Sequence, residues 1–214
     1  LGTSTGTAGT LDLLKGAGRT YVAGDYHPSP ASMAGAAMIG GLAPRTPGSW
    51  TAKFKRRTGV PPVKLTPTQR TNLIARHANF YETVAGVNIT SEGTTSAGPS
   101  DIRGFIDNVV SLDWQENDMA SAIFGDLASA DKVPRTDPGM VVLKNAMKGS
   151  LRRGVANGVA AELSADQVGG PSPRVDVPLV ADMDDLLPRG VRASFSFKLA
   201  GAVHHADING VVLL

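Results

Sequence analysis

The sequence predicts an α/β chain of the α+β kind that is divided into two parts. Residues 101–127 and 138–155 repeat apolar side chains at helical spacing, which predicts two long helices. Residues 191–199 alternate apolar and other side chains, as a strand does. A polar loop over 93–99 separates these elements from shorter ones before it. We therefore expect a mixed α/β domain over 11–99 and a second domain over 100–214.

The first part begins with short elements. Residues 1–10 are rich in Gly and Thr and are typical of a linker or a severed loop. A short helix is expected over Leu11–Lys15, closed by Gly16 or Gly18, and a short strand over Thr20–Ala23. Small residues fill 30–42, which predicts a buried helix that another element can approach closely.

A strand is expected over 49–55, because apolar and polar or basic side chains alternate there. This pattern places Trp50, Ala52 and Phe54 inside and gives the strand a basic outer face with Lys53 and Lys55.

The next elements have local signals of their own. Thr66 followed by Pro67 is typical of a helix start, and that helix should run to about residue 78. His77 lies at the end of that helix, where a positive charge interacts favourably with the helix dipole, so we expect it to cap the helix. Two β-prone runs, 79–84 and 87–91, flank Ala85-Gly86 and predict a hairpin.

The second part should contain the two long helices and three strands. Ser100 or Asp101 is expected to cap the first helix, and Pro138 lies in the first turn of the second. Strands are expected over 174–180, 191–199 and 204–214. The last run ends in an apolar segment without charge or proline, Val211–Leu214. Such a strand pairs either inside its own sheet or with the sheet of a neighbouring subunit.

Charge is unevenly distributed along the chain. The formal net charge is only +2, yet residues 26–81 hold no Asp or Glu and residues 82–137 hold ten. Residues 26–81 are therefore a basic third of the chain and residues 82–137 an acidic third. The opposite charges of the two thirds can pair within the chain or between copies. A nucleic-acid-binding module using the basic segment 45–76 is the alternative. It is disfavoured because aromatic stacking residues do not alternate with the basic ones.

The sequence gives little support for catalysis. The four histidines, His27, His77, His204 and His205, lie outside any nucleophile motif, and the glycine pairs lack the pattern of a phosphate-binding loop. The chain has no cysteine and no apolar run of membrane-spanning length. We expect no catalytic, cofactor or metal site, and no membrane span. A hydrolase with a dispersed site remains a second rival.

Five segments together resemble the tail sheath proteins of contractile-tailed bacteriophages, in the branch found in many myophages and prophages. They are 77–95, 104–114, 132–139, 149–158 and 191–212, including Asn79-Phe80-Tyr81, Gly86-Val87-Asn88-Ile89-Thr90 and Asp113-Trp114. The resemblance covers about 11–214, and it implies that this chain is the C-terminal portion of a longer subunit.

The resemblance implies a structural role without enzymatic activity. Sheath subunits polymerise around a tail tube and contract to drive that tube through the host envelope. The implied partners are other copies, the tail tube protein, and baseplate and tail terminator proteins. The implied location is the virion tail, with assembly in the host cytoplasm.

The resemblance also assigns positions within this chain. Residues 100–214 would form a tube-proximal domain of two helices packed on a small, mostly antiparallel sheet, and 11–99 a peripheral domain. The candidate subunit contacts are Val211, Val212, Leu213, Leu214, Asp113, Glu116, Asp118, Lys53, Lys55, Arg56 and Arg57.

Overall fold

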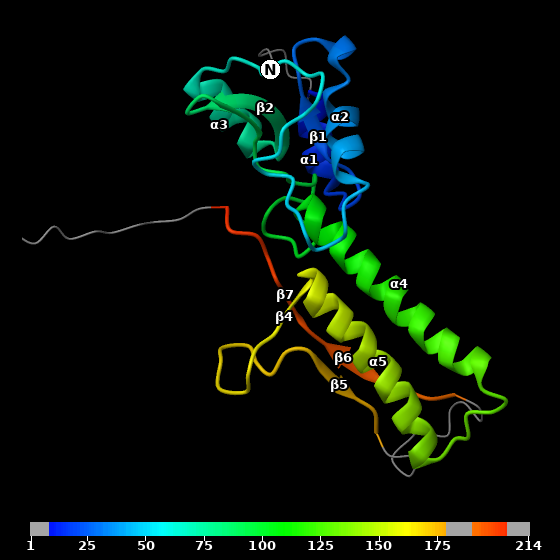
Figure 1. Cartoon of the computed structure of the whole chain (residues 1–214). Helices are drawn as coiled ribbons and strands as arrows, with labels where there is room; N and C mark the ends of the chain where they lie inside the picture. Colours follow the sequence, from blue (N-terminus) through cyan, green and yellow to red (C-terminus); the bar gives the residue numbers. More distant parts are fainter. Residues whose placement is uncertain (1–8, 179–189, 205–214) are drawn as a thin grey trace, which may run out of the picture. The chain divides into compact units, whose positions relative to one another are not determined.

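A computed structural model describes residues 9–178 and 190–204 (Figure 1). The chain divides into two compact units. Unit 1 comprises Leu1–Arg45, Trp50–Val109 and Gly201–Leu214, and unit 2 comprises Thr46–Ser49 and Val110–Ala200. Helices and small sheets occur in this chain together, so the predicted α+β fold class is confirmed.

Unit 1 is built on a three-stranded sheet. Its elements are α1 (Thr10–Ala17), β1 (Gly24–Tyr26), the 3-10 helix η1 (Pro30–Ser32), α2 (Ala34–Leu42), α3 (Pro67–Ala75), β2 (Ala78–Val84) and β3 (Val87–Thr90). The strand order is β1-β2-β3, with β1 parallel and β3 antiparallel to β2. The fully buried Phe80 and Leu73 join β2 to α3 in the core, and Val63 and Ala78 complete this cluster.

Local chemistry explains why several of these elements form where the sequence predicts them. Thr66 and Gln69 make a reciprocal capping box at the start of α3. Gly18 ends α1 in the left-handed conformation. Ala85 and Gly86 both have positive φ, as a tight two-residue hairpin turn requires.

The predicted strand over 49–55 is wrong. Phe54 has a φ of 68°, so the backbone turns and the side chains cease to alternate. Phe54 is therefore 47% exposed, whereas Lys53 is only 6% exposed. The short strand expected over 20–23 instead forms at β1, and the expected helix over 30–42 is broken at Met33, whose φ is 49°.

The polar segment 93–99, expected to mark the boundary between the two parts, belongs to unit 1 and is largely buried. Thr94, Thr95 and Ser96 are buried, and Asn79 on β2 exchanges two hydrogen bonds of 2.8 Å with the backbone of Thr94. These bonds satisfy the polar groups inside unit 1, and the two units divide after Val109.

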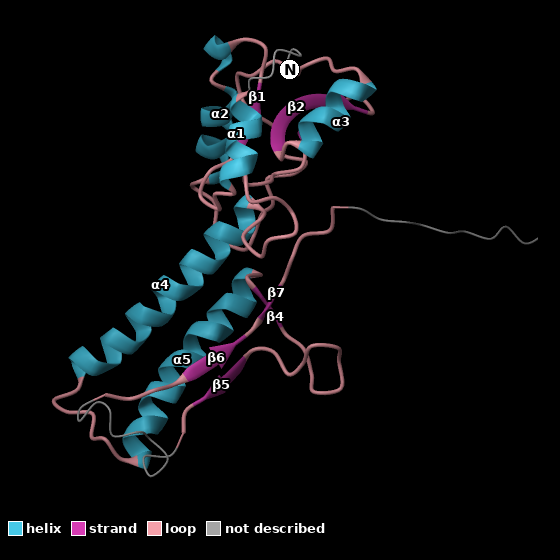
Figure 2. Cartoon of the chain, turned by 180° about the vertical axis from the view of Figure 1, so that it is seen from behind, coloured by secondary structure: helices cyan, strands magenta, loops and turns pink. Residues whose placement is uncertain are grey.

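Unit 2 contains a pair of long helices and two small antiparallel sheets. Its elements are most of α4 (Ile106–Ser129), α5 (Asp137–Asn157), β4 (Ala160–Ala161), β5 (Arg174–Asp176), β6 (Ser194–Ser196) and β7 (Lys198–Leu199). Strand β4 pairs with β7, and β5 pairs with β6. Helices α4 and α5 lie side by side in both views (Figures 1 and 2). Met119, Met147 and Leu151 form their shared core, against which Val175 and Phe197 pack.

Several boundaries in unit 2 differ from the sequence predictions. Helix α4 begins at Ile106 rather than after Ser100, and the Asp101 carboxylate accepts a hydrogen bond from the Arg103 backbone N–H in a turn before the helix. The single strand expected over 191–199 is divided into β6 and β7, which pair with different partners. Of the predicted terminal strand, only His204 is described, and it is not in a strand; Val211–Leu214 lie outside the described residues.

Candidate interaction surfaces

The most buried cation of the basic segment is Arg57, and it is paired inside unit 1. Its guanidinium donates to Asp25 Oδ2 at 2.8 Å and to Thr90 Oγ1 at 3.1 Å, and it lies 5.7 Å from the centre of the Tyr81 ring. Burial raises the pKa of Asp25, while the Arg57 charge opposes that shift. Arg57, 3% exposed, thus has an internal partner and presents little surface to a neighbouring molecule.

Three further cations of the segment are paired within the same unit. Lys53 Nζ lies 3.2 Å from Glu92, Arg70 Nε lies 2.9 Å from Glu82, and Arg76 Nε lies 2.7 Å from Asp12. Four of the eight Lys and Arg residues between Arg45 and Arg76 are therefore neutralised locally. This pairing weakens the case for a phosphate-binding surface on the segment.

The candidate contacts Lys55 and Arg56 are more accessible than Lys53 and Arg57. Arg56 is exposed and Lys55 is half-buried. Their contact with a neighbouring subunit stays a prediction. Lys53 was expected on an outer strand face and Arg57 was a candidate subunit contact, whereas the structure buries both side chains inside unit 1.

Two of the described histidines, His204 and His77, contact polar groups of unit 1. His204 Nε2 lies 3.0 Å from Thr51 Oγ1, and Thr51 in turn hydrogen-bonds the buried Asp107. His77 lies just after α3, where its Nδ1 is 3.1 Å from the Ser96 carbonyl oxygen.

The described residues hold neither a cluster suited to a metal ion nor a helix suited to a membrane span. Over 9–178 and 190–204, no group of three or more His, Asp and Glu side chains is placed to hold a metal ion. Within the same ranges, no helix is both long enough and apolar enough to cross a bilayer.

A buried polar contact joins α4 to α5. The fully buried Gln115 donates from Nε2 to Ser150 Oγ at 2.8 Å, and Ser150 donates to Asp118 Oδ2 at 2.6 Å. Arg153 also donates to Asp118 from Nε and, at 2.8 Å, from Nη2. Partial burial raises the pKa of Asp118, but the hydrogen bonds from Arg153 and Ser150 outweigh this effect, so the pKa is lowered.

Among the three acidic contact candidates, Asp118 is therefore occupied by α5 of its own chain. Asp113 is half-buried on α4, and Glu116 is exposed on the same helix. Their role as subunit contacts stays a prediction.

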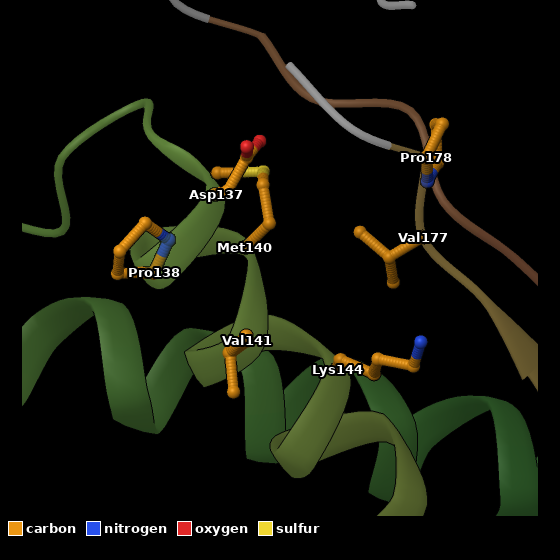
Figure 3. Close-up of a pocket in the computed structure, with 7 residues that line it drawn as sticks. All are labelled: Asp137, Pro138, Met140, Val141, Lys144, Val177 and Pro178. Atoms are coloured by element: carbon orange, nitrogen blue, oxygen red, sulfur yellow. The ribbon is translucent and has the colours of Figure 1, made fainter.

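A groove of about 520 Å³ lies between the start of α5 and the residues that follow β5 (Figure 3). Its walls are mostly apolar, with Met140 and Val141 on α5 and Val177 and Pro178 across from them. The Lys144 stem lies along the same wall.

A second groove of about 850 Å³ lies further along α5. Lys148 and Arg152 line it together with the apolar Leu151 and Val155, and Glu162 lies on the opposite wall. Basic side chains of α5 thus border both grooves.

The described surfaces combine internally paired charges with two open grooves along α5. Comparison with known families is more specific. Residues 106–170 match the family model described as "E217 tail sheath protein gp31-like, C-terminal domain". The resemblance to tail sheath proteins of contractile-tailed bacteriophages is thereby confirmed for this part of the chain. No curated protein matches the sequence.

A solved structure shares the fold. Its title is "Cryo-EM structure of the anti-feeding prophage (AFP) baseplate, 6-fold symmetrised". The TM-score is 0.62 at 14% sequence identity, and the likeness covers 83% of this chain and 48% of that chain. This chain therefore spans about half the length of its structural neighbour.

The segments that carried the sequence resemblance fall partly inside the matched range. The segment 104–114 overlaps its start, and 132–139 and 149–158 lie within it. The segments 77–95 and 191–212 lie outside it. The sequence pattern gave no sign of the Gln115–Ser150–Asp118 contact, because that contact depends on how α4 and α5 are aligned.

Proposed function

We propose that the chain is part of a structural subunit of a bacteriophage contractile tail sheath. It polymerises around the tail tube and contracts to drive the tube through the host envelope. The observation that carries this proposal is the match of α4, α5 and β4, within residues 106–170, to a tail sheath C-terminal domain. The shared fold with a prophage baseplate chain supports the same kind of assembly.

The proposed partners are other copies of the chain, the tail tube protein, and baseplate and tail terminator proteins. The proposed location is the virion tail, with assembly in the host cytoplasm. We propose no enzymatic activity. The match of residues 106–170 to a tail sheath family supports this view.

The apolar C-terminal segment Val211–Leu214 is proposed to add a strand to the sheet of a neighbouring subunit. Main-chain hydrogen bonds supply the affinity in such strand addition, so deletion of the segment should weaken assembly. The test is deletion of Val211–Leu214, followed by measurement of polymer yield and of folding by circular dichroism. A folded deletion variant that polymerises like wild type contradicts the role of this strand.

Co-sedimentation tests the proposal as a whole. The purified chain is mixed with preformed tail tubes and pelleted, and the pellet is compared with that of each component alone. Saturable recovery of the chain with the tubes supports the sheath role. A chain that stays in the supernatant at every concentration contradicts it.

The nucleic-acid alternative is distinguished by salt dependence. Phosphate contacts release counterions, so the affinity for duplex DNA would fall steeply between low and physiological salt. The four internal ion pairs of the basic segment lead us to expect weak binding even at low salt.

A further inference from the structure

His204 holds the chain to unit 1 shortly before the C-terminal segment begins. Residues 201–203 are exposed, whereas His204 is half-buried. Its imidazole Nε2 lies 3.0 Å from Thr51 Oγ1, and both residues belong to unit 1. Among the described residues 201–204, His204 is thus the one whose side chain turns onto the unit.

The polar side of this contact has a fixed direction. The Asp107 carboxylate is buried and accepts a hydrogen bond from the Thr51 hydroxyl. A hydroxyl has one hydrogen to donate, so the Thr51 oxygen remains as an acceptor toward His204. The Nε2–H of His204 is therefore the donor, and the charge of Asp107 strengthens this bond through Thr51.

Two phenyl rings contact the imidazole of His204. The centre of the Phe105 ring lies 5.0 Å from that of His204 at an interplanar angle of 85°, and the Phe54 ring lies 6.4 Å away at 82°. Both pairs are edge-to-face, within the distances at which aromatic rings attract. The imidazole is thus held through its ring as well as through its nitrogen.

The backbone of Phe54 is fixed in a conformation that favours glycine. Its φ is 68°, which is strained for a bulky residue. The Phe54 N–H donates to the Thr90 carbonyl oxygen at 2.9 Å, and the Thr90 N–H donates to the Lys55 carbonyl oxygen at 2.8 Å. These bonds to the end of β3 hold the turn, so the ring of Phe54, although 47% exposed, is kept against His204.

We propose that His204 is a positioning residue for the C-terminal segment: its contact with Thr51, Phe54 and Phe105 fixes the point at which residues 205–214 leave unit 1. This inference deepens the proposed strand addition by Val211–Leu214 and rests on it. A fixed starting point limits where that strand can pair. It also reduces the entropy lost when the strand adds to the sheet of another subunit.

The length of chain after the contact sets the size of the effect. Val211 is seven residues beyond His204, so it can reach at most about 25 Å from the contact. Without the contact, the nearest earlier backbone bond among the described residues joins the Ala200 N–H to the Val159 carbonyl oxygen, and Val211 is eleven residues beyond Ala200. Effective concentration falls with tether length roughly as the −3/2 power, so release of His204 should lower it about twofold.

Hydrogen–deuterium exchange at the imidazole C2 position, measured on the full chain by mass spectrometry over a range of pH, tests the contact. Thr51→Val removes the hydroxyl and keeps the side-chain shape, and Phe54→Gly removes the ring at a position whose φ suits glycine. Together they should speed exchange at His204 at least fivefold, while His27 and His77 in the same unit keep the wild-type rate. Unchanged exchange at His204 would overturn the proposal.

The matched control is Thr83→Val, which removes a hydroxyl that bonds Asn88 elsewhere in unit 1. It should leave exchange at His204 unchanged. Urea unfolding checks that each variant folds. If Phe54→Gly does not fold, Thr51→Val alone takes its place and should speed exchange at least twofold.

Co-sedimentation with tail tubes tests the positioning role. His204→Ala should raise the concentration that gives half-maximal recovery about twofold, because the tether is longer. His204→Gln keeps an N–H donor for Thr51 without the ring, so it should fall between wild type and His204→Ala. The matched control His27→Ala removes an imidazole that contacts Ser29 and Pro61 in the same unit, and it should bind like wild type.

A double-mutant comparison shows whether His204 acts through the terminal strand. In a chain that lacks Val211–Leu214, His204→Ala should have no further effect on recovery with tubes. An equal loss in the shortened and the full chain would overturn the positioning role, because the effect would then be on unit 1 itself.

The outcomes separate this inference from the sheath role. If exchange at His204 rises in the double variant but His204→Ala pellets with tubes like wild type, the positioning role is overturned and the sheath role stands. If the wild-type chain never pellets with tubes, the sheath role and the positioning role fall together, and the exchange result still decides whether the contact exists.

Discussion

Two glycines of α5 are expected to respond in opposite directions to the same substitution. A Cβ at Gly154 would meet the side-chain amide of Gln115 on α4, with the Oε1 atom in direct conflict and Cδ only 3.1 Å away. A Cβ at Gly149 would meet only the end of Arg153, at 3.7 Å. We expect Gly154→Ala to destabilise unit 2 and Gly149→Ala to stabilise it.

The magnitudes follow from two opposing effects. Alanine is favoured over glycine inside a helix by about 0.8–1.0 kcal/mol, and Gly149→Ala should realise most of this gain. At Gly154, overpacking costs about 1–3 kcal/mol. Displacement of Gln115 also breaks its buried bond to Ser150, at about 1–3 kcal/mol. The net change for Gly154→Ala is a loss of about 1–5 kcal/mol.

Urea unfolding measures both variants. The chain has two tryptophans, and Trp50→Phe leaves Trp114 on α4 as the reporter of unit 2. If the slope of unfolding free energy against urea concentration is unchanged, the shift in the urea midpoint gives the change in the free energy of unfolding. In a Gln115→Ala background, Gly154→Ala should lose its penalty. A Gly154→Ala variant as stable as Gly149→Ala in the original background would refute the packing argument.

Three further outcomes are expected. Phe80→Ala should destabilise unit 1 by about 3–5 kcal/mol in thermal or urea unfolding, because Phe80 is fully buried; a loss below 1 kcal/mol would contradict the assigned core. Thr66→Ala should cost about 1 kcal/mol by removing the capping box with Gln69, and Thr66→Ser, which keeps the hydroxyl, should restore it. Asp118 has a lowered pKa, so its contribution is present above the unfolded value near 3.9 and is lost as the pH falls through the folded pKa. Asp118→Asn should therefore be less stable than wild type at pH 7, with a difference that shrinks in acid; a difference independent of pH would contradict the charged pairing with Arg153.

Elements with local signals could be predicted from the sequence. The cap at Thr66, the left-handed Gly18 and the Ala85-Gly86 turn each depend on a few neighbouring residues, and each forms as expected. The core face of α5 followed from its apolar periodicity.

Elements decided by distant contacts could not be predicted. The alternation around Lys53 indicated a strand, but Glu92 draws the Lys53 amine into unit 1 and the backbone turns at Phe54. The polar composition of 93–99 indicated a boundary, but Asn79 supplies the hydrogen bonds that bury Thr94. In each case a partner far along the chain satisfies a polar group that a local pattern assigns to solvent.

For the candidate interaction surfaces too, the sequence showed the local pattern of charge but not the distant partners. Segregated charge indicated pairing within the chain or between copies, and the structure assigns Lys53 and Arg57 to internal partners. Asp113 and Glu116 could be named as candidate subunit contacts from the sequence, and that role stays a prediction.

Electron microscopy of the chain assembled in the presence of tail tubes tests the sheath role most directly. We expect tubes decorated by a continuous, regularly repeating outer layer, with a longer and a shorter form of that layer when assembly is followed by mild destabilisation. Bare tubes beside dispersed, monomeric chain at high concentration would contradict the account.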